Sequence, residues 1–295
     1  MHFKQYNNLS EFYEVTFDLL MCHEAQNVIP LGNIIMGNKG EDKSGWRDPA
    51  NWFMATVSDD VGVQLTAIMT PPHNLTLYAR ENKIDEAVVE CLIEGIGDVP
   101  VPGIMAKKDM ALYFADEYCS AKGLIYKTAM EQRLYELTEV NPDIAQIGTM
   151  RSANESDMYF LPFWLEAFYS AETYGKTVMD IPQDTEPYLD RIRQGKVFIL
   201  EVDGKPVSIA GPNREMKTVC GVGNVFTPPY YRGKGYATSL VAKLSRMILD
   251  RGFKKCVLYT DLANATSNNI YQKIGYRPIC DSVMLSFTQP AQDVI

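Results

Sequence analysis

The chain has 295 residues, of which 46% are hydrophobic and 22% charged, and its formal net charge is −9. No stretch approaches the roughly 20 apolar residues that span a bilayer, and the first residues lack the basic and apolar regions of a secretory signal. We therefore expect a cytoplasmic protein without a membrane partner, and the length predicts two domains.

The charge is divided unevenly along the chain. Residues 1–150 carry 11 Lys and Arg against 22 Asp and Glu, a balance of −11, whereas residues 151–295 carry 17 against 15, a balance of +2. Nucleic acid is not expected as a partner, because neutralising its phosphates requires clustered Lys and Arg. The second half is the better place to receive a polyanionic small ligand.

Cysteine and histidine usage gives no sign of a metal site. The six cysteines are scattered without a C-x-x-C pair, and none of the three histidines lies at zinc-ligand spacing from them. We expect reduced, buried thiols and no bound metal.

The first half alternates helical and strand-like patterns. Apolar residues at helical spacing predict helices at Leu9–Leu20, Ile84–Ile96 and Met110–Ser120. Strands are expected at Trp52–Val57, Val63–Met69 and Leu124–Leu137, the first two joined as a hairpin. The polar, glycine-containing run Gly37–Asp42 is expected to be an exposed loop.

The second half then repeats this order of elements. Helices are expected at Phe163–Tyr174, Tyr236–Arg251 and Ser267–Ile274, and strands at Lys196–Val202, Pro206–Ala210, Val219–Phe226, Lys255–Thr260 and Tyr276–Phe287. Phe53 and Phe198 occupy like places, as do Gly123 and Gly275, although almost no residues match outright. An internal duplication is therefore predicted, with an α/β domain at residues 1–140 and another at 145–295.

The segment from Val225 to Ala237 connects a predicted strand to a predicted helix and carries the clearest chemistry. Gly233 and Gly235 allow successive backbone N–H groups to turn toward one point. The helix that follows adds its free N-terminal amides and the positive end of its dipole. Arg232 and Lys234 supply cationic donors. Together these features predict a diphosphate site.

Two other nucleotide motifs do not fit this segment. A P-loop needs Ser or Thr directly after Gly-Lys, whereas Lys234 is followed by Gly235. The run that begins at Gly221 imitates a dinucleotide fingerprint, but Phe226 stands where the third glycine belongs, and the run leads to the end of a strand rather than into a helix.

The loop Arg232-Gly233-Lys234-Gly235-Tyr236-Ala237 resembles the signature loop of the GNAT superfamily of N-acetyltransferases. A second block is similar to the Asn-x-x-Ser-Asn-x-x-Tyr-x-x-x-Gly-Tyr element that closes such domains, and it runs from Asn264 to Tyr276. The resemblance covers roughly residues 145–290, about half of the chain.

The resemblance implies a mixed, mostly antiparallel sheet flanked by helices, with acetyl-CoA as cosubstrate between the strands near 219–227 and 255–260. It implies direct transfer of the acetyl group to a primary amine in a ternary complex. Tyr271 would be the general acid for the departing thiolate. The implied coenzyme-binding residues are Val225, Phe226, Thr227, Arg232, Gly233, Lys234, Gly235, Tyr236, Ala237, Asn264 and Asn268.

The general base is where the sequence departs from the family pattern. Many members place a Glu on the strand before the pyrophosphate loop, but residues 218–225 contain no carboxylate. Glu201 is the candidate base, with Glu215 and Asp261 as other nearby acids, and a water relay to one of them is equally open. Cys220, a lone thiol on an apolar strand, is expected to be a packing residue.

Two of the implied roles have structural alternatives. Ile270 and Ile274 share an apolar helix face with Tyr271, so Tyr271 could be a core residue, and Asn264 could be a helix cap.

The first half lacks the glycine loop, because residues 75–83 contain no glycine where the loop would lie. We expect a degenerate GNAT-like domain that helps to shape the acceptor pocket, and one active site per chain. The acceptor would be a small-molecule or peptide amine. The alternatives are a CoA-binding sensor or scaffold without turnover, and an acyltransferase that uses another acyl-CoA. The sequence does not define the acceptor or the oligomeric state.

Overall fold

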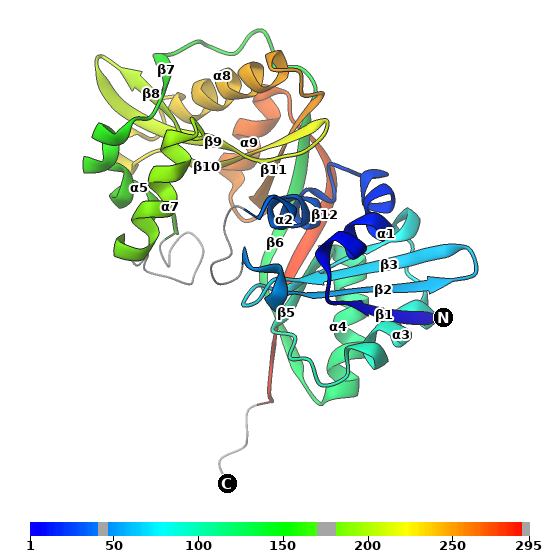
Figure 1. The fold of residues 1–295 in the computed structure, drawn as a ribbon. Coiled ribbons are helices and arrows are strands. Elements are labelled where there is room, and N and C mark those ends of the chain that lie inside the picture. Colours follow the sequence, from blue (N-terminus) through cyan, green and yellow to red (C-terminus); the bar gives the residue numbers. More distant parts are fainter. Residues whose placement is uncertain (41–46, 170–180, 291–295) are drawn as a thin grey trace. The chain divides into compact units, whose positions relative to one another are not determined.

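The computed structural model describes residues 1–40, 47–169 and 181–290 (Figure 1). The described elements of the first half are β1 (His2–Tyr6), α1 (Leu9–Met21), α2 (Val28–Lys39), β2 (Phe53–Asp59), β3 (Gly62–Met69), β4 (Leu75–Ala79), α3 (Glu86–Ile96), β5 (Gly103–Lys107), α4 (Lys108–Lys122) and β6 (Ile125–Leu137). Those of the second half are β7 (Thr149–Ser152), α5 (Leu161–Tyr169), α7 (Ile181–Arg193), β8 (Phe198–Val202), β9 (Lys205–Glu215), β10 (Val219–Phe226), α8 (Tyr236–Asp250), β11 (Lys255–Asp261), α9 (Ala265–Ile274) and β12 (Arg277–Thr288).

The two halves repeat one order of elements. Among the described helices and strands, each half runs strand, two helices, three strands, helix, strand, helix, strand. The predicted duplication is therefore present in the fold, although few residues match. A common fold survives because it depends on the pattern of apolar positions more than on the identity of each residue.

The chain packs into two compact units that differ from the sequence halves. The first unit contains Met1–Leu134, Thr260–Ala263 and the chain from Pro278, and the second contains Tyr135–Tyr259 and Asn264–Arg277. The last strand of the chain, β12, thus belongs to the first unit, where it pairs with β5. The last residues of β6 belong to the second unit.

In the first unit the strands follow the order β1-β2-β3-β4-β5-β12-β6. β4 and β5 are parallel, whereas β1 to β4 pair antiparallel in succession. Helices α3 and α4 supply apolar side chains to a core shared with β2 to β5, and this core also contains Val283 and Leu285 of β12. α1 lies against β2 and β3 and packs on α2.

In the second unit the order is β6-β11-β10-β9-β8-β7, with β10 and β11 parallel and β7 to β10 antiparallel. One core places α8 and α9 against β8 to β11, and it also contains Tyr135, Leu137 and Val140. A separate core places α5 and α7 against Ile199, Ile209 and Phe226. The sheet is therefore covered by helices on both faces.

Most predicted elements are confirmed, but strands β1, β4, β5 and β7 and two helices were not predicted. α2 begins at Val28 and includes Gly37, so the loop expected at Gly37–Asp42 is helical at its start, and residues 41–42 lie outside the described residues. Its apolar residues are spread around the helix rather than along one stripe, which hides the helical period. α7 contains Pro187, which predicts a break rather than a helix. The helix expected at Phe163–Tyr174 is described as far as Tyr169.

Candidate functional site

The parallel strands β10 and β11 pair only where they begin. Val219, Cys220 and Gly221 are opposite Lys255, Cys256 and Val257. Beyond this point β10 continues to Phe226 and β11 to Asp261 without further pairing to each other. Backbone groups on the facing edges are thus left available for a ligand, since strand edges need hydrogen-bond partners.

A β-bulge lies on this open stretch of β10. Between the pairs Gly223–Gly211 and Phe226–Ile209, β10 advances by three residues and β9 by two. Asn224 in the bulge has a positive φ of 53°. A bulge bends its strand and redirects backbone groups, and bulges occur often beside active sites. Val225 therefore lies where the resemblance requires main-chain contacts to a pantetheine arm.

The end of β10 is tied to β9. The Ser208 hydroxyl donates to the Phe226 carbonyl at 3.0 Å and lies 2.8 Å from the Thr227 hydroxyl. The Phe226 side chain is buried against Trp164 of α5. Phe226 thus packs in the core, and Thr227 is held at the end of β10, beside the gap between β10 and β11.

The glycine loop leads into α8 with its amides turned outward. Gly233 and Gly235 have φ values of 78° and 77°, which favour glycine strongly. Gly235 is the N-cap, and no described side chain caps the helix or places a negative charge in its first turn. Arg232 folds back, because its Nε donates to the Thr227 carbonyl at 3.0 Å. The exposed helix start retains the free amides that an anion requires.

The start of α8 is also fixed from outside the helix. The Ser239 hydroxyl accepts from the Ile147 amide at 2.9 Å and donates to the Ile147 carbonyl at 2.8 Å. The Lys243 ammonium donates to Gln146 at 3.0 Å. The segment that precedes β7 thus holds the helix start in place.

In the Asn264–Tyr276 block both asparagines have partners within the fold. Asn264 is the N-cap of α9 and accepts from the Ser267 amide at 3.0 Å, which is its alternative structural role. The Asn268 side chain donates to the Asn264 carbonyl at 2.8 Å and accepts from the Tyr135 hydroxyl at 3.0 Å. If either asparagine contacts a coenzyme, its side chain must do so while it also makes these hydrogen bonds within the fold.

Tyr271 lies deep in this block. Its side chain is 8% exposed, and its ring centroid is 6.4 Å from that of Tyr135 and 6.0 Å from that of Tyr276. Sequence reasoning missed Tyr135, which lies on β6 and is fully buried. Local periodicity marks Tyr135 as a strand residue, but only the fold brings it to α9.

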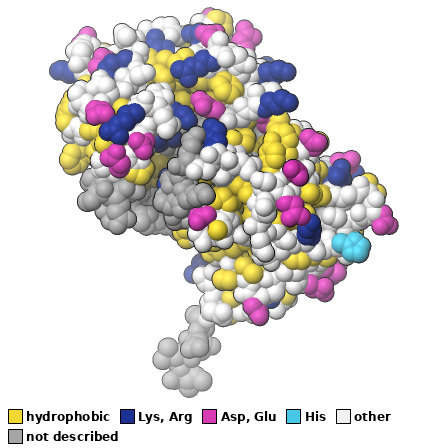
Figure 2. Space-filling model, viewed as in Figure 1, with side chains coloured by type: hydrophobic (Ala, Val, Ile, Leu, Met, Phe, Trp, Pro, Cys, Tyr) yellow, Lys and Arg dark blue, Asp and Glu magenta, His cyan; other side chains and the backbone are white. Residues whose placement is uncertain are grey.

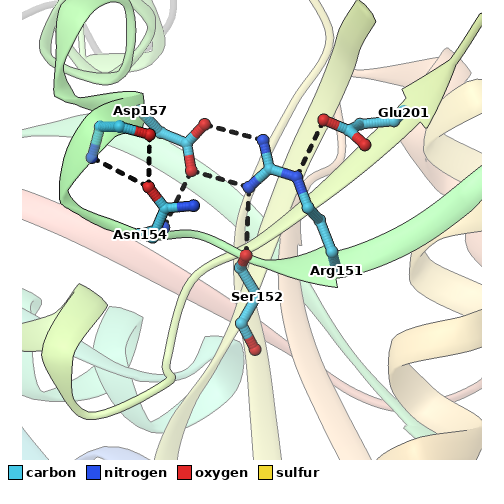
Figure 3. Close-up of polar contacts among 6 residues, drawn as sticks. Arg151, Ser152, Asn154, Asp157 and Glu201 are labelled. Atoms are coloured by element: carbon cyan, nitrogen blue, oxygen red, sulfur yellow. Dashed lines mark hydrogen bonds and ion pairs between the residues drawn. The ribbon is translucent and has the colours of Figure 1, made fainter. Parts of the chain in front are cut away.

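Glu201, the candidate base, belongs to an ion network around Arg151 (Figure 3). The Arg151 Nε donates to Glu201 at 2.8 Å, and its two Nη groups donate to the Asp157 carboxylate at 2.7 Å each. Burial disfavours the charge of Asp157, but the hydrogen bonds from Arg151 and the Asn154 amide outweigh it and hold the pKa of Asp157 below its ordinary value. Glu201 lies on β8, and β9 separates β8 from β10.

The other acids named from sequence are partly engaged as well. Glu215 is 3.8 Å from the Lys196 ammonium, and Asp261 accepts from the Ala263 amide at 2.8 Å. Cys220 is fully buried, and burial raises the pKa of its thiol to about 12. A thiol in that state is protonated at neutral pH, so Cys220 is a packing residue as expected.

The first half differs at the matching place in its bulge and its helix start, although β4 and β5 also pair only at Leu75–Ile104 and Thr76–Met105. β3 and β4 pair without a register shift. The N-cap of α3 is Asp85, whose carboxylate accepts from the Val88 amide, and Glu86 adds a second acid to the first turn. Negative charge at a helix start repels an anion and occupies an amide that would bind it. We therefore propose that this half keeps the fold but lacks the site.

Side chains of each charge are also distributed unevenly over the surface. On the face shown in Figure 2, Lys and Arg gather more on the second unit than on the first.

Within the described ranges, no group of three or more His, Cys, Asp or Glu is arranged to hold a metal ion. None of the described helices has the length and apolar character needed to cross a membrane.

Comparison with known proteins agrees with this geometry. Residues 161–276 match the model of the acetyltransferase (GNAT) family. An uncharacterized N-acetyltransferase of Methanocaldococcus jannaschii is 24% identical over 135 residues, which are 43% of this chain and 60% of that protein. The chain therefore spans about 60% of the length of this curated relative. The matched range includes both sequence blocks, and the resemblance stated above is confirmed.

Solved structures extend the likeness to the whole chain. A GCN5-related N-acetyltransferase from Sphaerobacter thermophilus superposes with a TM-score of 0.64 at 14% identity, covering 99% of this chain and 98% of that one. A tandem GNAT protein from the clavulanic acid biosynthesis pathway gives 0.57 at 11% identity, covering 99% and 100%. At such identities the likeness shows the fold, and the predicted pair of GNAT-like domains is confirmed.

Proposed function

We propose that this chain, which carries a GNAT acetyltransferase domain in its second half, transfers the acetyl group of acetyl-CoA to a primary amine. The observation that supports this most directly is the opening between β10 and β11, bulged at Asn224 and adjoined by the uncapped start of α8. An open strand edge and a free helix start are the two surfaces that a pantetheine arm and a pyrophosphate need.

The residues present fit acetyl-CoA as a cosubstrate. The main chain of Val225 near the end of β10, and that of Thr227 just after the strand, would bind the amides of the pantetheine arm. The backbone N–H groups from Gly233 to Ala237 would bind the pyrophosphate, because they surround the positive end of the α8 dipole, whereas the Arg232 amide already donates to the Pro229 carbonyl at 3.2 Å. Lys234 is exposed, so its ammonium can add a charge-assisted hydrogen bond.

In the transfer the amine nitrogen forms a bond to the acetyl carbonyl carbon, and the bond between that carbon and sulfur breaks. The amine loses a proton and the departing sulfur gains one. We assign the delivery of that proton to the Tyr271 hydroxyl, because a phenol can supply the proton that a departing thiolate needs.

The structure favours a different role for Glu201 from the one first considered. The Glu201 carboxylate already accepts a charge-assisted hydrogen bond from Arg151, and β9 separates its strand from β10, so its position opposes its use as a base. We propose instead that Glu201 holds β7 and β8 together through Arg151, and that the amine loses its proton through a water relay that ends at Glu215 or Asp261. Replacement of Glu201 by Gln should therefore lower stability more than kcat at neutral pH.

Release of free thiol from acetyl-CoA, followed over a panel of primary amines, tests the function. Tyr271→Phe should lower kcat by about 100-fold, the usual contribution of one acid catalyst, and should leave the KM for acetyl-CoA within about threefold. Tight CoA binding without turnover on any amine would contradict transfer and support a sensor. Faster release with another acyl-CoA would redirect the proposal to that acyl group.

The pyrophosphate assignment has its own test. Lys234→Glu should weaken CoA binding about 10-fold or more in calorimetry, because it places a carboxylate beside the phosphates. Lys205→Glu makes the same charge change in the exposed β8–β9 turn and serves as the control. Equal affinities for the two variants would contradict the assignment.

A further inference from the structure

Three tyrosines surround the glycine loop that leads into α8. Tyr231 and Tyr236 are partly buried and pack against the core that α8 shares with β8 to β11. Tyr230 differs from them, because 68% of its side chain is exposed. A single exposed aromatic residue is ordinary on a protein surface, but this one stands three positions before Gly233, at the edge of the proposed pyrophosphate site.

The three rings form a connected row. The ring centroid of Tyr230 is 4.6 Å from that of Tyr231, and the ring planes are inclined at 63°. The Tyr231 centroid is 6.4 Å from that of Tyr236, the first residue of α8, at an inclination of 66°. Both are edge contacts, a preferred arrangement of aromatic pairs. The row thus connects the exposed ring of Tyr230 to the helix start that would bind the pyrophosphate.

The backbone that carries Tyr230 is restrained. Pro228 and Pro229 precede it, and each proline fixes its own φ. The Tyr231 amide donates to the Pro228 carbonyl at 2.9 Å, and the Arg232 amide donates to the Pro229 carbonyl at 3.2 Å. These bonds close a single 3-10 turn. Tyr230 is therefore presented on a backbone with little freedom, which lowers the entropy lost when a ligand contacts its ring.

The two side chains between Tyr230 and Gly233 are committed elsewhere. Arg232 donates from Nε to the Thr227 carbonyl at 3.0 Å, and Tyr231 packs against the core. Tyr230 is neither bonded nor buried in this way. A ring that is mostly exposed can stack on a flat ligand group, because stacking uses the face of the ring and not its hydroxyl.

The coenzyme supplies a flat group at this place. In CoA only a ribose separates the adenine ring from the pyrophosphate, and the pantetheine arm leaves the pyrophosphate on its other side. Because the arm would extend along β10 into the gap between β10 and β11, the adenine would leave the glycine loop toward solvent. An exposed tyrosine beside the loop offers this ring a surface on which to stack.

We propose that Tyr230 binds the adenine ring of acetyl-CoA by stacking, so that the chain recognises the nucleotide end of the coenzyme through an aromatic contact. This inference rests on the proposed binding of acetyl-CoA and adds a binding residue to the same site. The affinity of the site for the coenzyme then depends on the base as well as on the phosphates.

Calorimetry on the full chain tests the proposal with two ligands, CoA and 4′-phosphopantetheine, which lacks the adenosine. Tyr230→Ala should bind CoA about 5- to 100-fold more weakly than the parent, as expected for the loss of one stacked base. Its affinity for 4′-phosphopantetheine should equal that of the parent. Tyr230→Phe should bind both ligands like the parent, because it keeps the ring.

Tyr159→Ala is the matched control. Tyr159 is 71% exposed, belongs to the same unit and makes a similar edge contact, with Phe160 at 5.0 Å and 69°. This variant should bind CoA like the parent, because Tyr159 lies in the short helix before α5 and not beside the glycine loop. The fluorescence of 1,N6-etheno-CoA at saturation gives a second readout. Stacking should quench the modified base in the parent and in Tyr230→Phe, but not in Tyr230→Ala.

The proposal is overturned if Tyr230→Ala binds CoA as tightly as the parent, if it loses the same affinity for both ligands, or if the parent does not quench etheno-CoA. Thiol release from acetyl-CoA is measured separately. CoA binding that depends on Tyr230 without any transfer would contradict the proposed reaction alone. Transfer with an unchanged KM for acetyl-CoA in Tyr230→Ala would contradict the stacking alone.

Discussion

Arg151 shows how one side chain can hold several segments of the second half together. It extends from β7, binds Asp157 in the short helix Glu155–Tyr159 with both Nη groups, and binds Glu201 on β8 with Nε. Asp157 is almost fully buried, so its charge depends on these donors. The network positions the entry to α5, and α5 carries the Tyr169 that bonds to Asn224.

Asp157→Asn tests this network through pH. The folded pKa of Asp157 lies below its ordinary value of 3.8, so its contribution to stability is complete above that pH and is lost as the pH falls through the folded pKa. We expect the variant to lose about 2 kcal/mol of unfolding free energy at pH 7. Urea unfolding at pH 7 and pH 3 should show a smaller difference between variant and parent at pH 3. A difference that does not depend on pH would contradict the ionic role.

Tyr135→Phe tests how α9 is positioned. The change keeps the ring but leaves the Asn268 Oδ1 and the Gln272 amide without the hydroxyl that lies 3.0 Å from each. We expect a loss of about 1–2 kcal/mol in stability and an increase of several-fold in the KM for acetyl-CoA. Tyr126→Phe is the matched control, since its hydroxyl also bonds a side chain, that of Asp116, but in the first unit. An unchanged KM in Tyr135→Phe would show that Asn268 does not serve the coenzyme.

At the scale of elements, the contrast between α3 and α8 explains why two similar folds carry different chemistry. Both helices follow the third strand of a three-stranded run and begin beside a parallel strand pair. α8 begins after Gly235 without an acid, whereas α3 begins with Asp85 and Glu86. From these few residues at the helix starts we expect α8, and not α3, to bind an anion.

The contrast predicts one coenzyme per chain. Calorimetric titration with CoA should give a stoichiometry near one. Asp85→Ala should lower stability by about 1 kcal/mol through the lost cap without creating a second site, because the first half also lacks the bulge and the glycines. A stoichiometry of two in either protein would contradict the assignment of the first half as degenerate.

The elements that could be predicted from sequence are those with clear local signals. α8 has apolar residues at helical spacing between a glycine and Gly252, and its predicted and observed bounds differ by one residue. The glycine loop was likewise recognisable, since Gly233 and Gly235 perform their function through backbone conformation alone. α2 and α7 could not be predicted, because tertiary burial overrides their weak periodicity and the proline at 187.

The contact of Tyr135 and the bulge at Arg214 could not be predicted for a different reason. Tyr135 reaches Asn268 across 133 residues of sequence, and the bulge at Arg214 follows from how β9 pairs with β10. Neither property is present in a local pattern. Glu201 illustrates the same limit, since its position on a strand does not reveal the arginine beside it.

At the scale of the whole molecule, the two units do not follow the two sequence halves, because β12 belongs to the first unit and the last residues of β6 belong to the second. The core of the first unit includes Val283 and Leu285 from β12, which are 1% and 0% exposed. The core of the second unit includes Tyr135, Leu137 and Val140, which are 0%, 1% and 7% exposed. The core of each unit therefore includes residues from outside its own sequence repeat. These residues come from the other half, or from the connection between the halves.

This arrangement of the chain predicts how fragments will behave. The fragment 145–295 lacks the three buried residues of the second core, and their burial contributes roughly 1.5–3 kcal/mol each. It also lacks Asn141, whose amide and side chain donate to the last carbonyls of α9 at 2.8 and 3.1 Å. The summed loss is comparable to the roughly 5–15 kcal/mol that stabilises a domain. In addition, β12 would expose apolar side chains that normally lie in the first unit.

The fragment 132–277 follows the second unit instead of the sequence half. It restores the three core residues and Asn141 and omits most of β12, so it should give a cooperative thermal transition and bind CoA, whereas 145–295 should aggregate. Comparing these two fragments also tests the domain boundaries at residues 140 and 145 that the sequence predicts. If 145–295 folds and is fully active alone, then the residues from outside its sequence repeat are dispensable, and the first half does not shape the acceptor pocket.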